Sequence, residues 1–148
     1  MRNELTLLQR KTAVKIVVDS YAWIEVFIGS RKGMKAKELL IKAEEIYTPD
    51  TVMAEIARKY FREGNDEETI LDRLRAITEI SAVTSIDVET ALESAKCCME
   101  LLERARKARM RTPSLFDAIV LATARRQEAK ILTGDEHLRD LPETLWMG

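Results

Sequence analysis

The stretch VKIVVDSYAW, residues 14–23, decides the fold because it begins as a buried strand and then meets an acid. Its IVV run is continuous and β-branched, which is typical of a strand covered on both faces. Asp19 follows with no turn residue in between. A second run of this kind, KILTG at residues 130–134, stands immediately before Asp135. The sequence therefore predicts two buried strands that each lead into a carboxylate.

Helical patterns separate the strand candidates along the chain. We expect a short helix that ends at Gly29, then helices over residues 34–46, 51–62, from Asn65 or Asp66 to about 79, 87–111 and 115–127, with brief strands at 46–50 and 80–83. In the long helix, the spacing predicts that six residues face inward: Val88, Ala91, Leu92, Ala95, Met99 and Leu102. Strands that alternate with helices predict an α/β fold with a central parallel sheet. We expect one domain over residues 14–148, after a polar N-terminal extension over 1–13.

Composition limits the classes of partner. The 148 residues carry 24 basic and 25 acidic side chains, a formal charge of −1, so any nucleic acid must meet a local patch rather than a net positive charge. No apolar run is long enough to span a bilayer, and no secretory leader stands at the start, so we expect a cytoplasmic protein with no membrane partner. The adjacent Cys97 and Cys98 suit a reducing compartment, and with His137 as the only histidine they make a poor zinc site.

Two acids follow strands, and two more lie on helix faces that point inward. In an open parallel sheet, ligands bind beyond the carboxyl ends of the strands, where Asp19 and Asp135 lie. Each could instead cap the next helix. Asp117 lies among apolar residues in SLFDAIVLATA, and its alternative role is a capping box with Ser114.

Glu55 repeats this situation on an earlier helix. Val52 and Ile56 share its side of the helix, and its alternative role is an exposed ion pair with Lys59 at i+4. Taken together, the four acids have no matching buried cations in the pattern. Carboxylates that converge must take up protons or share a cation. Oxygen ligands select Mg²⁺ or Mn²⁺, which can neutralise a phosphodiester and activate a water, so the pattern indicates nuclease chemistry.

At these residues the chain resembles the PIN-domain family, and in particular the VapC-type toxin ribonucleases. The resemblance covers residues 15–141 and rests on four segments in order: IVVDSYAWIE with Asp19, TPDTVMAEIARKY with Glu55, SLFDAIVLATAR with Asp117, and ILTGDEHL with Asp135. Each segment is degenerate by itself, but the four at this spacing are fairly specific.

The resemblance implies a three-layer α/β/α fold and a Mg²⁺- or Mn²⁺-dependent endoribonuclease, the toxin of a toxin–antitoxin pair. It implies that Asp19, Asp117 and Asp135 are catalytic residues that bind the metal. It implies that Glu55 is a catalytic carboxylate that acts through a metal-bound water or accepts a proton. Ser20 and Thr133 match supporting hydroxyl positions. It also implies an RNA substrate, a homodimer and a small antitoxin that occupies the pocket.

The chain departs from the family pattern at two places. The extension over residues 1–13 precedes the first strand, and Gly134 stands where many members have a larger residue. The second departure leaves the geometry of Asp135 open.

Basic clusters offer candidate RNA contacts, although a solvated face explains them as well. The segment 104–111 carries five basic residues, and Arg31, Lys32 and Lys35 form a second cluster. A non-catalytic PIN-like module that binds protein or RNA is the alternative function. A receiver domain fits less well, because the first strand lacks a pair of adjacent acids and no lysine follows Thr133.

Overall fold

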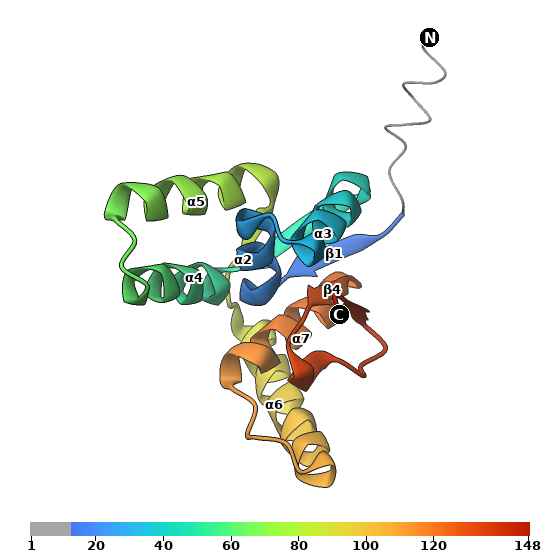
Figure 1. The fold of residues 1–148 in the computed structure, drawn as a ribbon. Helices are drawn as coiled ribbons and strands as arrows, with labels where there is room; N and C mark the ends of the chain where they lie inside the picture. The colour runs from blue at the N-terminus through green and yellow to red at the C-terminus, as the bar shows by residue number, and fades with distance from the viewer. Residues whose placement is uncertain (1–12) are drawn as a thin grey trace.

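The computed structural model describes residues 13–148, in which five strands form one sheet (Figure 1). The strands are β1 (Lys15–Val18), β2 (Glu45–Pro49), β3 (Ala82–Thr84), β4 (Lys130–Thr133) and β5 (Thr144–Trp146). Their order in the sheet is β3-β2-β1-β4-β5, and every neighbouring pair is parallel. The predicted parallel sheet is confirmed. Of the extension expected over residues 1–13, residues 1–12 lie outside the described residues.

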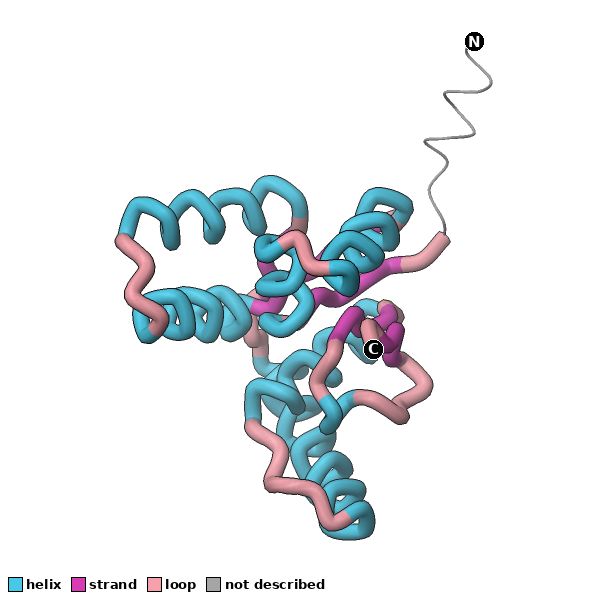
Figure 2. The backbone as a smooth tube through the Cα atoms, in the orientation of Figure 1, coloured by secondary structure: helices cyan, strands magenta, loops and turns pink. Residues whose placement is uncertain are grey.

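Helices flank the sheet on both sides (Figure 2). They are α2 (Ser20–Ile28), α3 (Arg31–Lys42), α4 (Asp50–Arg62), α5 (Glu67–Ile80), α6 (Val88–Ala108) and α7 (Leu115–Gln127), with a short 3₁₀ turn, η1 (Glu136–Leu138). The connections through α2–α3 and α4–α5 move outward from β1 to β3, whereas α6–α7 return the chain to β4 on the other side of β1. Because crossovers are right-handed, this reversal places α6 and α7 on the opposite side from α2 and α3, which gives three layers.

The reversal of strand order places the site. β1 lies between β2 and β4, and the chain leaves β1 in one direction and β4 in the other. Val18 pairs in register with Leu132, so the residues after these two strands come out side by side. Those residues are Asp19 on one strand and Thr133 to Asp135 on the other. Ligands of open parallel sheets bind at such a switch point.

The core is apolar and continuous across the sheet. The β1 residues Ile16 to Val18 are buried, as are the facing side chains Ile131 and Leu132 of β4. Of the aromatic residues expected in the core, Trp23 and Tyr60 are buried and Phe27 is partly buried beside Trp23. The expectation that these rings pack rather than stack on bases is therefore confirmed for Trp23 and Tyr60.

Local sequence signals fix the helix ends. Side chains of Asp19, Asp66 and Asp87 each accept a hydrogen bond from the first turn of the following helix. Gly29 ends α2 at a φ of 73°, the left-handed conformation that glycine adopts without a Cβ clash. The predicted stop at Gly29 and the predicted cap at Asp66 are confirmed.

Two predicted boundaries were wrong, and one strand was not predicted. The second helix is α3, which begins at Arg31 and ends at Lys42, so Ile46 belongs to β2 instead of extending its apolar stripe. The weak strand lies at Ala82–Thr84 because α5 continues to Ile80. The tail contains a further strand, β5, which the sequence did not predict.

The inward face of α6 also differs from the prediction. Val88, Leu92 and Met99 are exposed by 82%, 61% and 68%. The buried residues are instead Thr90, Ser94, Cys97, Leu101 and Ala105. This face packs against α7, and small side chains allow the close approach of two helices. Hydrophobicity alone chose the wrong stripe, because α6 carries apolar residues on both faces.

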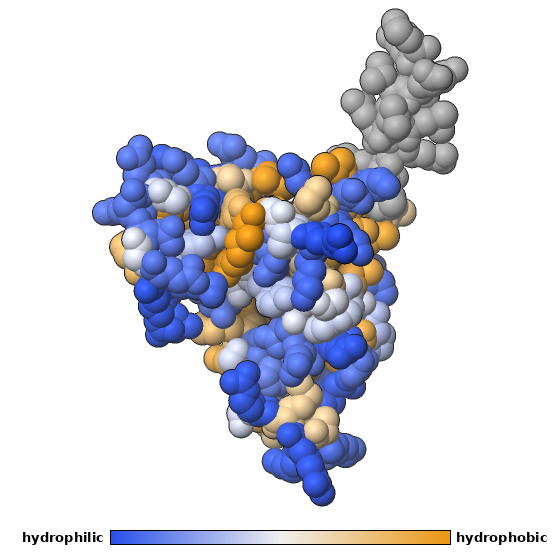
Figure 3. Space-filling view, viewed as in Figure 1, coloured by the Kyte–Doolittle hydropathy of each residue, from blue (hydrophilic) through white to orange (hydrophobic). Residues whose placement is uncertain are grey.

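The outer surface is mostly polar in the view of Figure 3, with apolar side chains gathered over α2. Among the helices of residues 13–148, none is long and apolar enough to cross a membrane.

Candidate active site

Asp19 is held rigidly at the end of β1. Its side chain is 6% exposed, and one carboxylate oxygen accepts a hydrogen bond from the Ala22 amide at 2.9 Å. The Thr133 hydroxyl, at the end of β4, donates to the other oxygen. Asp19 is thus the cap of α2, as one reading of the sequence predicted, and it is also a buried acid at the switch point. The contact also places Thr133 where a supporting hydroxyl was expected.

Asp117 lies in the first turn of α7, directly across from that edge. Its carboxylate accepts the Ser114 amide at 2.9 Å, and its own amide donates to the Ser114 hydroxyl at 3.2 Å. The capping box is therefore present. It uses Oδ2 for the Ser114 amide, and the carboxylate still reaches the pocket that the loop before α7 helps to line. The cap orients Asp117 and does not remove it from the site.

Asp135 and His137 form the third side of the site. The Asp135 amide donates to the Thr133 hydroxyl at 2.9 Å, and its carboxylate accepts the His137 amide at 2.8 Å. The His137 ring follows, with Nδ1 3.1 Å from Asp135 Oδ1 and 3.9 Å from Asp117 Oδ2. Asp117, Asp135 and His137 each offer a ligand atom, and these atoms lie within 4.8 Å of one another.

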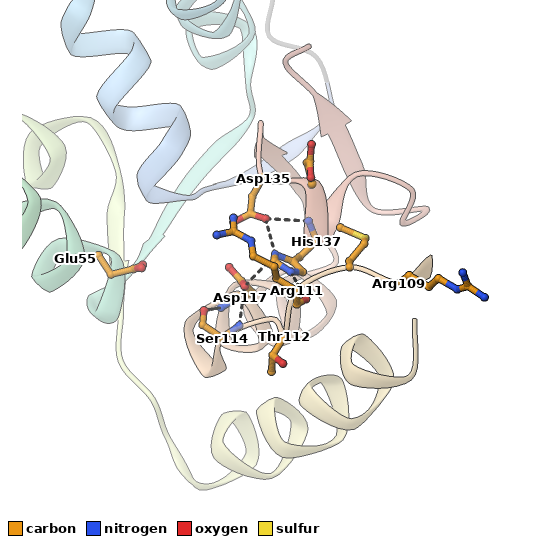
Figure 4. A pocket seen from close by; sticks show the side chains of 10 residues that line it. Glu55, Arg109, Arg111, Thr112, Ser114, Asp117, Asp135 and His137 are labelled. Carbon is orange, nitrogen blue, oxygen red and sulfur yellow. Dashed lines mark hydrogen bonds and ion pairs between the residues drawn. The ribbon is translucent and has the colours of Figure 1, made fainter. Parts of the chain in front are cut away.

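Glu55 faces this group from α4 across a cavity (Figure 4). The cavity has a volume of about 670 Å³, and Glu55, Asp117, Asp135 and His137 line it together with the loop before α7. The ion pair between Glu55 and Lys59, the alternative role considered for Glu55, does not form, because Lys59 pairs with Glu63 at 3.0 Å. Three of the four predicted acids therefore line one cavity, and the charges of two of them, Asp135 and Asp117, act on Asp19.

The electrostatics of these acids favour a cation. Burial raises the pKa of Asp19 to about 7, and the nearby charges of Asp135 and Asp117 add to that rise against the Thr133 and Ala22 hydrogen bonds. Burial also raises the pKa of Glu55 to about 7, with the charge of Asp117 contributing and Arg58 opposing. The pKa of Asp117 is raised by burial and by Asp135. A bound cation would favour the ionised form of these carboxylates and offset the cost of burying their charges together.

The pKa of His137 is also raised, but for a histidine this shift favours the charged form. Burial disfavours its charged form, but the Arg111 carbonyl and the charges of Asp135 and Asp117 outweigh burial and raise its pKa. Sequence reasoning missed this residue because it weighed the only histidine against the two cysteines rather than against the acids. The signal was present in the sequence, since His137 stands two residues after a strand-end acid.

Ser20 is the predicted residue that the structure brings least into the site. It is the first residue of α2 and lines a neighbouring hollow with Ile24, Glu55 and Arg58. Among residues 13–148, its hydroxyl forms no hydrogen bond with any of the four acids. Glu55 is the lining residue that this hollow has in common with the cavity described above.

Gly134 lies under the ring of Tyr21. A Cβ atom on Gly134 would fall 2.1 Å from Tyr21 Cε1, so the ring occupies the space that a side chain at position 134 would need. This contact accounts for the glycine that departs from the family pattern. Asp135 keeps its orientation through the Thr133 hydroxyl and the turn at η1.

The sequence matches a known family over most of its length. A model of the PIN domain matches residues 16–143. The chain belongs to the PIN domain family. The acids of this PIN domain lie in the order and at the elements that the sequence predicted.

Solved structures share the fold of this PIN domain at low sequence identity. A toxin–antitoxin complex from Klebsiella pneumoniae aligns with a TM-score of 0.67 and 18% identity, covering 93% of this chain and 98% of that one. A DNA-bound VapBC from Salmonella typhimurium gives 0.66 and 16%, covering 91% and 99%.

VapC20 of Mycobacterium tuberculosis, a toxin that cleaves the sarcin–ricin loop, gives a TM-score of 0.61 and 20% identity, covering 86% of this chain and 97% of that one. No curated protein matches the chain by sequence. At these identities, the solved structures establish the shared fold.

Proposed function

We propose that the protein is a metal-dependent endoribonuclease and the toxin of a toxin–antitoxin pair. The observation that carries the proposal is the gathering of Glu55, Asp117 and Asp135 around one cavity beside buried Asp19, with raised pKa values for three of the four acids. Structural ion pairs do not explain acids of this kind, whereas a cation site does.

The donor set fits a divalent metal. Asp117 and Asp135 would hold the ion, with Asp19 either as a third ligand or as a charge behind them, and Mg²⁺ or Mn²⁺ suits carboxylate oxygens. Such an ion supplies charge neutralisation at the scissile phosphate and an activated water. Glu55 lines the far side of the cavity, where it would accept the proton of an attacking water.

Thr133 and Ser114 would then act as supporting residues. Thr133 donates to Asp19 and accepts the Asp135 amide, so one hydroxyl sets the positions of two acids. Ser114 fixes Asp117 through the capping box. Groups of this kind tune metal affinity by about 10- to 100-fold through the ligands they orient.

The direct test is cleavage of single-stranded RNA with and without Mn²⁺. We expect wild-type protein to cut RNA only with the metal, and Asp19→Asn and Asp117→Asn each to lose that activity. Glu100→Gln is the matched control, because Glu100 pairs with Arg125 on α6 and α7 away from the cavity. Unchanged cleavage by both aspartate variants would refute the assignment.

A non-catalytic role is the second candidate. The same acids would then bind the basic side chains of a partner protein. Tight binding of an Arg-rich peptide, together with no RNA cleavage at any Mg²⁺ or Mn²⁺ concentration, would favour this alternative.

We also infer a small antitoxin partner and a cytoplasmic site of action. Toxin–antitoxin complexes are among the solved structures that share the fold, which supports the partner. Free Cys97 and Cys98 suit a reducing compartment, which supports the location. Where a short reading frame adjoins the gene, we expect its co-expression to yield a complex in which the RNase activity is suppressed.

A homodimer completes the proposal. Val88, Leu92 and Met99 leave an apolar stripe exposed on α6, which supports self-association. Light scattering of the wild type and of Leu92→Glu checks it, and we expect the variant to shift toward monomer. An equal mass for both proteins would place the dimer contact elsewhere or exclude it.

A further inference from the structure

Arg111 reaches into the acidic cavity from the loop that joins α6 to α7. Figure 4 shows its guanidinium on the side of the cavity where Asp117 and Asp135 lie, whereas the side chain of Arg109 extends away from them. Both arginines belong to the loop that lines the cavity. Within residues 13–148, Arg111 forms no ion pair. A cation therefore lines the same cavity as Asp117 and Asp135 without pairing with either.

His137 holds the backbone of that loop in place. Its Nε2 lies 2.7 Å from the Arg111 carbonyl oxygen, which can only accept, so Nε2 donates the hydrogen bond. The other end of His137 is fixed to the sheet, because its amide donates to Asp135 and its Nδ1 lies 3.1 Å from the same carboxylate. Residues 110–114 have no regular secondary structure, so this bond is a specific tie between the loop and the end of β4.

The charge pattern gives this arrangement a function. An RNA phosphate that enters an acidic cavity is repelled by every carboxylate that the metal does not neutralise. A guanidinium presents a planar fork of donors that matches two phosphate oxygens, and it keeps its charge at any working pH. An unpaired arginine at the rim of such a cavity is suited to hold the phosphate that the metal alone would share with the acids.

We infer that Arg111 contacts a phosphate of the RNA substrate and that His137 is the positioning residue that places Arg111 over the cavity. This inference rests on the proposed ribonuclease function. It adds a substrate contact from a loop that carries none of the four acids. The competing arrangement is a plug, in which Arg111 only neutralises the acids and leaves when metal and RNA bind.

The first experiment compares two arginines of one loop. Arg111→Gln and Arg109→Gln are each made in a Glu55→Gln background to suppress cleavage, and binding of a fluorescent single-stranded RNA is measured with Mn²⁺ at several salt concentrations. We expect Arg111→Gln to weaken binding about tenfold and to lower the salt slope by about one, as loss of one phosphate contact should. We expect Arg109→Gln to leave both nearly unchanged.

Two results would overturn this assignment of Arg111. Equal binding by the two variants would mean that Arg111 does not contact RNA. Tighter RNA binding by Arg111→Gln, or faster cleavage when Glu55 is intact, would identify the plug. Cleavage by the otherwise wild-type protein is measured alongside, so a failure of the ribonuclease function itself is seen separately.

The second experiment separates the two nitrogens of His137. A glutamine amide reaches about the position of Nε2, whereas an asparagine amide reaches only about that of Nδ1. We therefore expect His137→Gln to keep RNA affinity near that of wild type and His137→Asn to lose about as much as Arg111→Gln. The double variant Arg111→Gln/His137→Asn should lose no more than Arg111→Gln alone, because both changes remove one contact.

Folding is checked by thermal unfolding of each His137 variant. Loss of RNA affinity in His137→Gln equal to that in His137→Asn would overturn the positioning role. So would full affinity in His137→Asn, or additive losses in the double variant.

Discussion

Two groups of partly buried charged residues in this protein differ in whether their charges are paired. Arg125, in the last turn of α7, pairs with Glu100 of α6 at 2.6 Å and with Glu143 before β5 at 2.9 Å. The hydrogen bond from Arg125 lowers the pKa of Glu100. At the other group, burial raises the pKa of Asp19 and of Glu55. The first group is satisfied within the chain, whereas the raised pKa values of the second support our proposal that its acids bind a cation from outside the chain.

The difference follows from what each element supplies. Arg125 joins two helices and the C-terminal tail, so its cation lies between acids from separate elements. At the switch point the elements supply carboxylates, because Asp19 and Asp135 follow strands and Asp117 begins a helix. Side chains that are costly to the fold are common at sites that bind ligands. The two groups therefore differ in whether the chain itself supplies the partners of its charged side chains, and not in residue type.

The largest expected effect compares two glutamates. Glu55→Gln removes a proton acceptor from the cavity, and we expect Mn²⁺-dependent RNA cleavage to fall at least about 100-fold, as for loss of a general base. Glu100→Gln should leave the rate unchanged. The initial rates of both variants on one RNA substrate decide the matter, and comparable losses would erase the distinction between the two groups.

A second prediction concerns stability in the absence of metal. The raised pKa of Asp19 means that ionising it costs free energy in the folded state, so stability should fall as the pH rises from about 4 through about 7. Asp19→Asn has no such charge; its amide oxygen can still accept from the Ala22 amide, and its NH2 group can donate to the Thr133 hydroxyl. We expect the variant to be more stable than wild type by about 2 kcal/mol at pH 8 and similar to it below pH 4.

Urea unfolding of the metal-free proteins at several pH values measures this. A lower stability of Asp19→Asn at pH 8 would contradict this prediction. It would show that hydrogen bonds to the Asp19 carboxylate offset the cost of burying its charge, as the ion pairs do in the Arg125 group.

The third prediction is the pH dependence of metal binding. Mn²⁺ must displace the proton of Asp19 where the pH lies below about 7, so its affinity should rise with pH and level off above that value. We expect a gain of at least about tenfold between pH 6 and 8. Calorimetric titration at three pH values tests it, and proton release should be visible in buffers of different ionisation enthalpy. An affinity that is constant over this range would contradict the raised pKa values.

The smallest expected effect is the loss of the satisfied pair. Glu100→Gln should lower the free energy of unfolding by only about 0.5 to 1 kcal/mol at pH 7, because the Glu100 side chain is 42% exposed. The lowered pKa of Glu100 means that this contribution is present above the unfolded-state pKa and is lost as the pH falls. Chemical denaturation at pH 7 and at pH 3 should therefore give a difference that disappears in acid.

Much of the fold could be read from the sequence because buried strands and caps are local signals. The IVV run predicted β1, Gly29 predicted the end of α2, and Pro113 predicted the break before α7. The face of α6 could not be read, because its partner α7 accepts Thr90 and Ser94 in preference to Val88 and Leu92. Which stripe is buried depends on the neighbouring helix, and periodicity does not contain that information.

The candidate site divides in the same way. The strand-end positions of Asp19 and Asp135 are local facts, and the parallel sheet made their proximity predictable. His137 and Arg111 entered through contacts across 26 residues of chain, and no local pattern links them. The Glu55 alternative failed for a related reason, since Lys59 had a better placed partner in Glu63.

The close contact between Tyr21 and Gly134 makes these two positions dependent on each other during evolution. A larger residue at 134 requires the ring at 21 to be lost or to turn away, because both cannot occupy the same volume. Relatives with a bulky residue at 134 should therefore carry a smaller residue at 21 or hold its ring in another orientation.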